Sequence, residues 1–259
     1  MEVVPLSSVE EVAGLAADAI EDLVRSRPSA VLGLATGSSP LPTYRELVRR
    51  HRDGSAPPYA DVVCVLLDEY VGLPPDHPQG YRATIARELT DALGIDPARV
   101  HAPDPADPQR AGAAYERLLT ELGDVDLQVL GIGSDGHLAF NEPGSSLASR
   151  TRIKTLTERT RADNARFFGS VDDVPRHVLT QGLGTILDAG HLLLIATDVG
   201  KAGAVAACVE GPVTSQCPAS VLQLHPHATV LLHPSTAADL SGLAYYREVY
   251  AAKPSWQHL

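Results

Sequence analysis

Cysteine is scarce in this sequence, and its distribution excludes several kinds of site. The three cysteines, Cys64, Cys208 and Cys217, are odd in number and form neither a CxxC pair nor a Cys/His zinc spacing. Such usage favours reduced thiols in a cytoplasmic protein and argues against a metal centre. We therefore expect a cytoplasmic location and no metal.

Basic runs and long apolar runs are also missing. The 21 basic residues against 32 acidic ones give a formal charge of −11, so we expect no nucleic-acid surface. Residues 1–15 are acidic where a signal peptide would be basic, and no apolar run approaches the length of a membrane span. These absences predict a soluble protein that binds neither nucleic acid nor membrane.

Short apolar segments alternate with segments of helical periodicity along the chain. Buried strands are expected at 30–35, 61–67, 125–133, 191–197 and 228–233, with helices between them. This alternation predicts a mostly parallel sheet flanked by helices, a Rossmann-like three-layer α/β sandwich. No repeat or linker interrupts it, so we expect residues 1–259 to form a single domain.

Ligands of such sheets bind where the strands end and the helices begin. This rule selects three segments, TGSSP at 36–40, DEYVG at 68–72 and GSDGHLAFNEP at 133–143.

The first segment has the composition of an anion-binding turn. Its backbone N–H groups and the hydroxyls of Thr36, Ser38 and Ser39 can surround a phosphate at the start of a helix. An ordinary capping turn explains the motif equally well. A Walker A site is excluded because no GK[ST] follows.

The second segment places two carboxylates directly after a buried strand. Partial desolvation raises the pKa of a carboxylate, as a base that removes a proton from carbon near neutral pH requires. Taken alone, Asp68 and Glu69 are better explained as solvated turn acids.

The third segment concentrates titratable side chains. Residues 131–136 match GxGxxG, but Pro143 and Gly144 follow too soon for the helix of a dinucleotide fold, so we exclude NAD. His137 has Asp135 two residues before it and Glu142 five residues after it. A histidine among carboxylates is more typical of a proton carrier than of a structural residue.

A cationic strand follows a pair of serines. Arg150, Arg152 and Lys154 lie close after Ser145 and Ser146, which indicates a second phosphate site, although a solvated strand face explains this stretch more simply.

Taken together, these segments resemble the glucosamine-6-phosphate deaminase family. The similarity is carried by LGLATGSSPLPTYREL, LLDEYVGL, GIGSDGHLAFNEPGSSLASRTRIKTL and ARFF, in that order along nearly the whole chain. It implies conversion of D-glucosamine 6-phosphate and water to D-fructose 6-phosphate and ammonia, without metal or organic cofactor.

The resemblance also implies roles for individual residues. Asp68 matches the base that moves the C2 proton, and His137 matches the histidine that opens the sugar ring. Asp135 and Glu142 match carboxylates that fix the imidazole. The implied phosphate ligands are Thr36, Gly37, Ser38, Ser39, Arg166 and Lys201.

Some members of the family bind N-acetylglucosamine 6-phosphate at an activating site between subunits of a hexamer, whereas others are unregulated and form smaller assemblies. The residues that match the regulated pattern are Ser145, Ser146, Arg152, Lys154 and Tyr245. The resemblance therefore implies a homo-oligomer, a hexamer in the regulated case, with this activator as a second ligand.

Two alternatives are weighed against the deaminase. A 6-phosphogluconolactonase shares the fold class and a sugar-phosphate substrate, but the DEY triplet and the DGH…NE spacing favour the deaminase. A sugar-phosphate sensor of a transcription regulator would carry an N-terminal helix-turn-helix, and only residues 1–29 precede the first expected strand.

Overall fold

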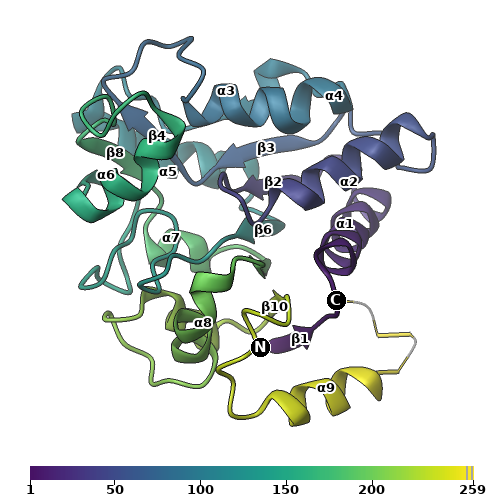
Figure 1. Ribbon diagram of the computed structural model, residues 1–259. Coiled ribbons are helices and arrows are strands. Elements are labelled where there is room, and N and C mark those ends of the chain that lie inside the picture. Colours follow the sequence, from purple (N-terminus) through teal and green to yellow (C-terminus); the bar gives the residue numbers. More distant parts are fainter. Residues whose placement is uncertain (255, 258) are drawn as a thin grey trace.

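The computed structural model describes residues 1–254, 256–257 and 259, and its largest feature is a parallel sheet (Figure 1). Seven strands follow the order β1-β10-β9-β6-β2-β3-β5, and each pairs with its neighbour in parallel. Their bounds are Glu2–Pro5, Ala228–Leu232, His191–Ala196, Leu127–Leu130, Val31–Leu34, Val63–Leu66 and Val100–His101 in that order. The predicted α/β architecture is confirmed.

Helices flank this sheet, as the alternation of segments predicted. The longer ones are α1 (Val9–Ser26), α2 (Leu41–Arg52), α5 (Pro108–Leu122), α8 (Ala202–Val209) and α9 (Leu243–Ala251). The shorter ones are α3 (Tyr81–Ile85), α4 (Asp91–Leu93), α6 (Glu158–Asn164) and α7 (Leu183–Leu187). At the start of α1, the backbone N–H of Glu11 donates to Oγ of Ser8 at 3.1 Å, so Ser8 caps this helix.

A second, antiparallel sheet was not expected. It consists of β4 (Asp68–Val71), β8 (His177–Thr180) and β7 (Arg152–Thr155), in the order β4-β8-β7. Only the strand at β7 was predicted, because β4 begins with two carboxylates and β8 is a four-residue segment without helical or alternating context. A small apolar cluster, which includes Tyr70, Phe140 and Val178, packs beside this sheet.

The strand order explains why the three selected segments meet. Strands β9, β6, β2 and β3 are consecutive neighbours in the large sheet. The segments that leave their carboxyl ends therefore lie along one edge. At this edge lie the turn after β2, the start of β4 after β3, and the 131–142 loop after β6. Residues 197–201, which follow β9, lie there too.

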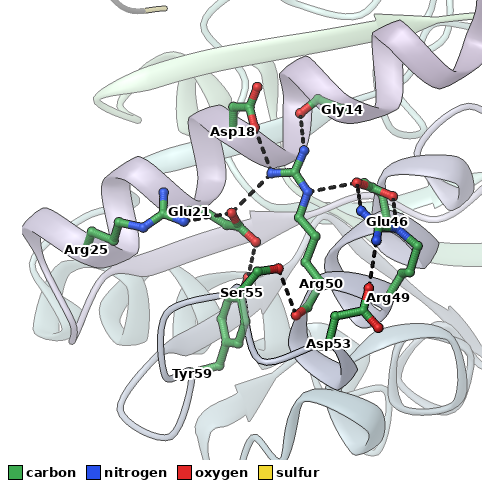
Figure 2. A network of polar contacts seen from close by, with 10 residues as sticks. All are labelled: Gly14, Asp18, Glu21, Arg25, Glu46, Arg49, Arg50, Asp53, Ser55 and Tyr59. Atoms are coloured by element: carbon green, nitrogen blue, oxygen red, sulfur yellow. Dashed lines mark hydrogen bonds and ion pairs between the residues drawn. The ribbon is translucent and has the colours of Figure 1, made fainter.

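Arg50 joins α1 to α2 at the side of the sheet (Figure 2). Its guanidinium contacts Asp18 at 2.6 Å, Glu21 at 3.1 Å and Glu46 at 2.8 Å, and it donates to the carbonyl of Gly14 at 3.3 Å. Glu21 is only 2% exposed, so its charge is stabilised mainly by protein groups. Arg50 therefore compensates the burial of this carboxylate while it links the two helices.

Replacing Arg50 with methionine is expected to lower the free energy of unfolding by about 2 to 4 kcal/mol, because a buried carboxylate loses a partner. Urea unfolding monitored by circular dichroism measures this loss. Arg49→Met is the matched control, since Arg49 is 58% exposed and its ion pairs contribute under about 1 kcal/mol. Equal losses in the two variants would contradict a special role for Arg50.

Candidate active site

The turn after β2 presents hydroxyl and backbone N–H groups to the carboxyl edge. Gly37 has φ +108°, a conformation that side chains with a Cβ rarely adopt. Pro40 precedes α2 and provides no side-chain cap, and among the described residues no other side chain accepts from the first N–H groups of this helix. Thr36, Ser38 and Ser39 lie in the same turn. The segment therefore has the geometry expected of an anion-binding turn.

Four of the residues expected to hold phosphate gather around Asp198. Oγ of Ser38 donates to Oδ2 of Asp198 at 2.7 Å, and Nζ of Lys201 lies 2.9 Å from the same oxygen. Nζ of Lys201 also lies 3.4 Å from Oγ of Ser39. Partial burial acts to raise the pKa of Asp198, but the bonds from Lys201 and Ser38 and the charge of Arg166 hold it below its ordinary value.

Asp198 was missed by the sequence reasoning. The available signal was its position, since it follows the 191–197 strand by one residue and precedes Lys201 by three. The same rule that selected the other carboxyl-edge segments therefore applied to it.

The two carboxylates of the DEYVG segment have opposite environments. Glu69 accepts hydrogen bonds at 2.9 Å from the backbone N–H groups of Tyr70, Tyr81 and Arg82, and so it caps the start of α3. Asp68 is 6% exposed, and within the described residues its carboxylate has no hydrogen bond or ion pair. The alternative of two solvated turn acids is therefore wrong.

Burial determines the protonation behaviour of Asp68. Desolvation raises the pKa of this carboxyl well above its ordinary value, and the nearby charge of Glu69 raises it further. A buried carboxylate without donors has the basicity that proton removal from carbon requires.

His137 and Asp135 form a close pair on the loop after β6. Nδ1 of His137 lies 2.6 Å from Oδ1 of Asp135, which also accepts from the backbone N–H of His137 at 3.2 Å. This hydrogen bond lowers the pKa of Asp135 to about 2. It places the proton of the neutral imidazole on Nδ1, which leaves Nε2 as the acceptor. A Cβ on Gly133 would lie 2.2 Å from the imidazole, so only glycine leaves room for this ring.

Thr180 connects the His137 loop to Asp68. It is the register partner of Asp68 between β4 and β8, and its Oγ1 accepts from the backbone N–H of Phe140 at 3.1 Å. Phe140 is three residues after His137 on the same loop. The structure thus brings the carboxylate and the loop of the Asp135–His137 pair to one edge of the large sheet.

Glu142 has different partners from those expected. Its Oε1 accepts from the hydroxyl of Thr157 at 3.0 Å and from the hydroxyl of Thr160, at the start of α6. Within the described part of the chain it makes no hydrogen bond or ion pair with His137, so the expectation of direct imidazole support is corrected to Asp135 alone. Glu142 instead connects this loop to the helix that precedes Arg166.

The residues of the expected activator site are only partly assembled. Arg152 and Lys154 are half-buried on β7, Ser146 is exposed, and Ser145 is buried with an unpartnered Oγ. Tyr245 is 64% exposed on α9, which packs against β1. Figure 1 shows α9 well apart from β8, the strand that pairs with β7. Within one chain, the helix of Tyr245 is therefore separate from the strand of Arg152 and Lys154.

A family model described as glucosamine-6-phosphate isomerases/6-phosphogluconolactonase matches residues 6–231. The chain belongs to this family. A glucosamine-6-phosphate deaminase from Arthrobacter sp. (strain FB24) is 59% identical over 261 residues, which cover 100% of both chains. The solved structure of a monomeric glucosamine-6-phosphate deaminase aligns with a TM-score of 0.89 and 40% identity, over 92% of this chain and 100% of that one.

The lactonase branch of the family shares the fold. A 6-phosphogluconolactonase from Trypanosoma cruzi aligns with a TM-score of 0.75 over 93% of this chain and 97% of its own, at 19% identity. This identity is low enough that the likeness concerns the fold alone.

The cysteines, the possible metal ligands and the helix lengths of this family member can be compared with the sequence predictions. Its three cysteines are free and buried. Among the residues that the structure describes, no group of three or more His, Cys, Asp and Glu side chains has a metal-binding arrangement, and no helix is both long and apolar enough to cross a membrane. The cytoplasmic location stays a prediction.

Asp68→Asn is expected to raise the urea midpoint of unfolding at pH 8. Because folding raises the pKa of Asp68, the contribution of this residue to stability is fully present below its ordinary pKa and is lost as the pH rises through the folded-state pKa. The gain from asparagine should therefore disappear towards pH 4.

Glu69→Gln is the matched control for this experiment. It weakens the cap of α3 and is expected to lower the free energy of unfolding by about 1 kcal/mol. A loss of stability in Asp68→Asn at pH 8 would show that the carboxylate has a stabilising partner after all.

Proposed function

We propose that this protein is a glucosamine-6-phosphate deaminase that converts D-glucosamine 6-phosphate and water to D-fructose 6-phosphate and ammonia. The observation that carries the proposal is the buried, unpaired carboxylate of Asp68 on the same edge as the Asp135–His137 pair. The full-length relatives that bear this enzyme name support the same substrate.

Ring opening is the first step, and His137 is the group suited to it. With Nδ1–H directed to Asp135, Nε2 accepts the proton of the anomeric hydroxyl and returns it to the ring oxygen. The C1–O5 bond then breaks and the open-chain aldehyde forms. Asp135 contributes by fixing the tautomer and orientation of the imidazole.

Asp68 performs the isomerisation in this proposal. The C1 aldehyde acidifies the C2 hydrogen. Asp68 removes this hydrogen as a proton while the ammonium group at C2 gives one of its protons to O1, which yields a neutral enolamine. The protonated carboxyl then delivers its proton to C1, which leaves an iminium at C2. Water adds at C2 and ammonia leaves, so the ketone of D-fructose 6-phosphate remains and the deamination is hydrolytic.

The phosphate of the substrate is assigned to the carboxyl edge near α2. The proposed ligands are Thr36, Gly37, Ser38, Ser39, Arg166 and Lys201. The uncapped N–H groups of α2 and the two cations supply the positive potential that a dianion requires in an acidic protein. Glu142 supports this end indirectly, because it anchors the start of α6 ahead of Arg166.

A coupled assay for ammonia and fructose 6-phosphate tests the proposal. Asp68→Asn and His137→Gln are each expected to lower kcat by roughly 10² to 10⁴, the usual contribution of a positioned acid or base. The kcat/KM of the wild type should decrease as the pH is lowered, because the base must be ionised. The midpoint of this decrease should lie above the ordinary pKa of aspartic acid. Glu121→Gln, an exposed change on α5, is the control.

Two outcomes would contradict this assignment. Retained turnover in Asp68→Asn would remove this residue from its role. Rapid opening of 6-phosphogluconolactone, without ammonia from glucosamine 6-phosphate, would favour the lactonase alternative.

The proposal extends to regulation by N-acetylglucosamine 6-phosphate in a homo-oligomer, a hexamer in the fully regulated form. Ser145, Ser146, Arg152 and Lys154 would bind the activator, and the unpartnered hydroxyl of Ser145 supports a ligand there. Because Tyr245 is distant within one chain, it would come from a neighbouring subunit.

Activator titration together with light scattering tests this part. The activator is expected to lower the half-saturating substrate concentration of the wild type and to have no effect on Lys154→Met. A monomer that ignores the activator would contradict it, and would match the related enzyme described as monomeric.

A further inference from the structure

Asp198 places a negative charge inside the proposed phosphate site. Its Oδ2 accepts from Ser38 at 2.7 Å and forms an ion pair with Lys201 at 2.9 Å, so one carboxylate oxygen engages two of the six proposed phosphate ligands. The Asp198 side chain is 41% exposed, whereas that of Lys201 is only 19% exposed. The partly buried cation is therefore held by a more exposed anion.

The donors that Asp198 engages are those that a phosphate would use. Carboxylate and phosphate oxygens accept the same charge-assisted hydrogen bonds from ammonium and hydroxyl groups. The phosphate of a bound substrate would therefore have to replace Asp198 at Ser38 and Lys201. If it did not, the two anions would repel one another at a partly buried position.

The backbone around Asp198 has room for this exchange. Val199 is 77% exposed, and a Cβ added to Gly200 would have no atom within 4 Å. Asp198 also lies on the short connection between β9 and the turn Val199–Lys201, outside both regular elements. Its side chain can therefore leave Lys201 without disturbing packed residues.

We propose that Asp198 is an internal competitor of the substrate phosphate. This inference rests on the proposed function. In the enzyme without substrate, the carboxylate of Asp198 binds the hydroxyl of Ser38 and the ammonium of Lys201 and keeps both groups oriented. A phosphate dianion displaces this carboxylate. The exchange weakens substrate binding but leaves the distant proton transfers at Asp68 and His137 unaffected. It also discriminates against monoanionic sugars, which compete less well with a resident carboxylate.

Asp198→Asn is the direct test. The amide keeps the shape of the side chain and removes its charge, so KM for glucosamine 6-phosphate is expected to fall roughly 5- to 20-fold while kcat stays within about twofold. Glu121→Gln removes the same charge from the end of α5 that precedes β6, at the opposite edge of the sheet, and should leave KM unchanged. A cooperative thermal unfolding transition confirms that each variant is folded. If Asp198→Asn does not fold, Asp198→Ser removes the same charge and replaces it in the test.

Inorganic phosphate provides a measurement that does not depend on turnover. Isothermal titration calorimetry is expected to give a Kd for phosphate that is lower in Asp198→Asn than in the wild type by a similar factor. If the wild type did not deaminate glucosamine 6-phosphate, the proposed function would fail while this titration still tested the competitor.

The opposite results would overturn the inference. A higher KM and weaker phosphate binding in Asp198→Asn would mean that the carboxylate only positions Lys201 for the substrate. Unchanged values of both quantities would mean that it has no influence on the site.

Discussion

The burial of Asp68 without a partner is the constraint on which the site depends. Asp68 and Glu69 follow β3 directly, and among the described residues only Glu69 accepts hydrogen bonds, from three backbone N–H groups at and near the start of α3. These hydrogen bonds connect β4 to the start of α3, and the residue before Glu69 is buried. One carboxylate thus stabilises the fold, and its neighbour is left destabilised and basic.

Much of the architecture was predictable because it depends on local sequence patterns. Short apolar segments between amphipathic helices admit few arrangements other than a parallel sheet. The convergence of the three loops then required only that β6, β2 and β3 be neighbours, which they are. The antiparallel sheet was not predictable in the same way, because β8 becomes a strand only by pairing with β4 and β7, and β4 lies about a hundred residues before it in the sequence.

The site shows the same division between local and distant contacts. Asp135 and His137 are two residues apart, and their hydrogen bond forms within one turn, so the spacing predicted it. Glu142 is five residues after His137, yet its partners are the hydroxyls of Thr157 and Thr160, which no local pattern indicated. Asp198 reaches Ser38 across 160 positions, a contact that only the tertiary structure reveals.

The contacts of Glu142 have a geometric consequence for the choice of sugar. They tie the loop of His137 to the helix ahead of Arg166, so the two ends of a bound hexose phosphate would be gripped by one continuous framework. Such a framework fixes the distance between the phosphate and the carbon that reacts. A sugar one carbon shorter or longer would seat its phosphate correctly and present the wrong carbon to Asp68.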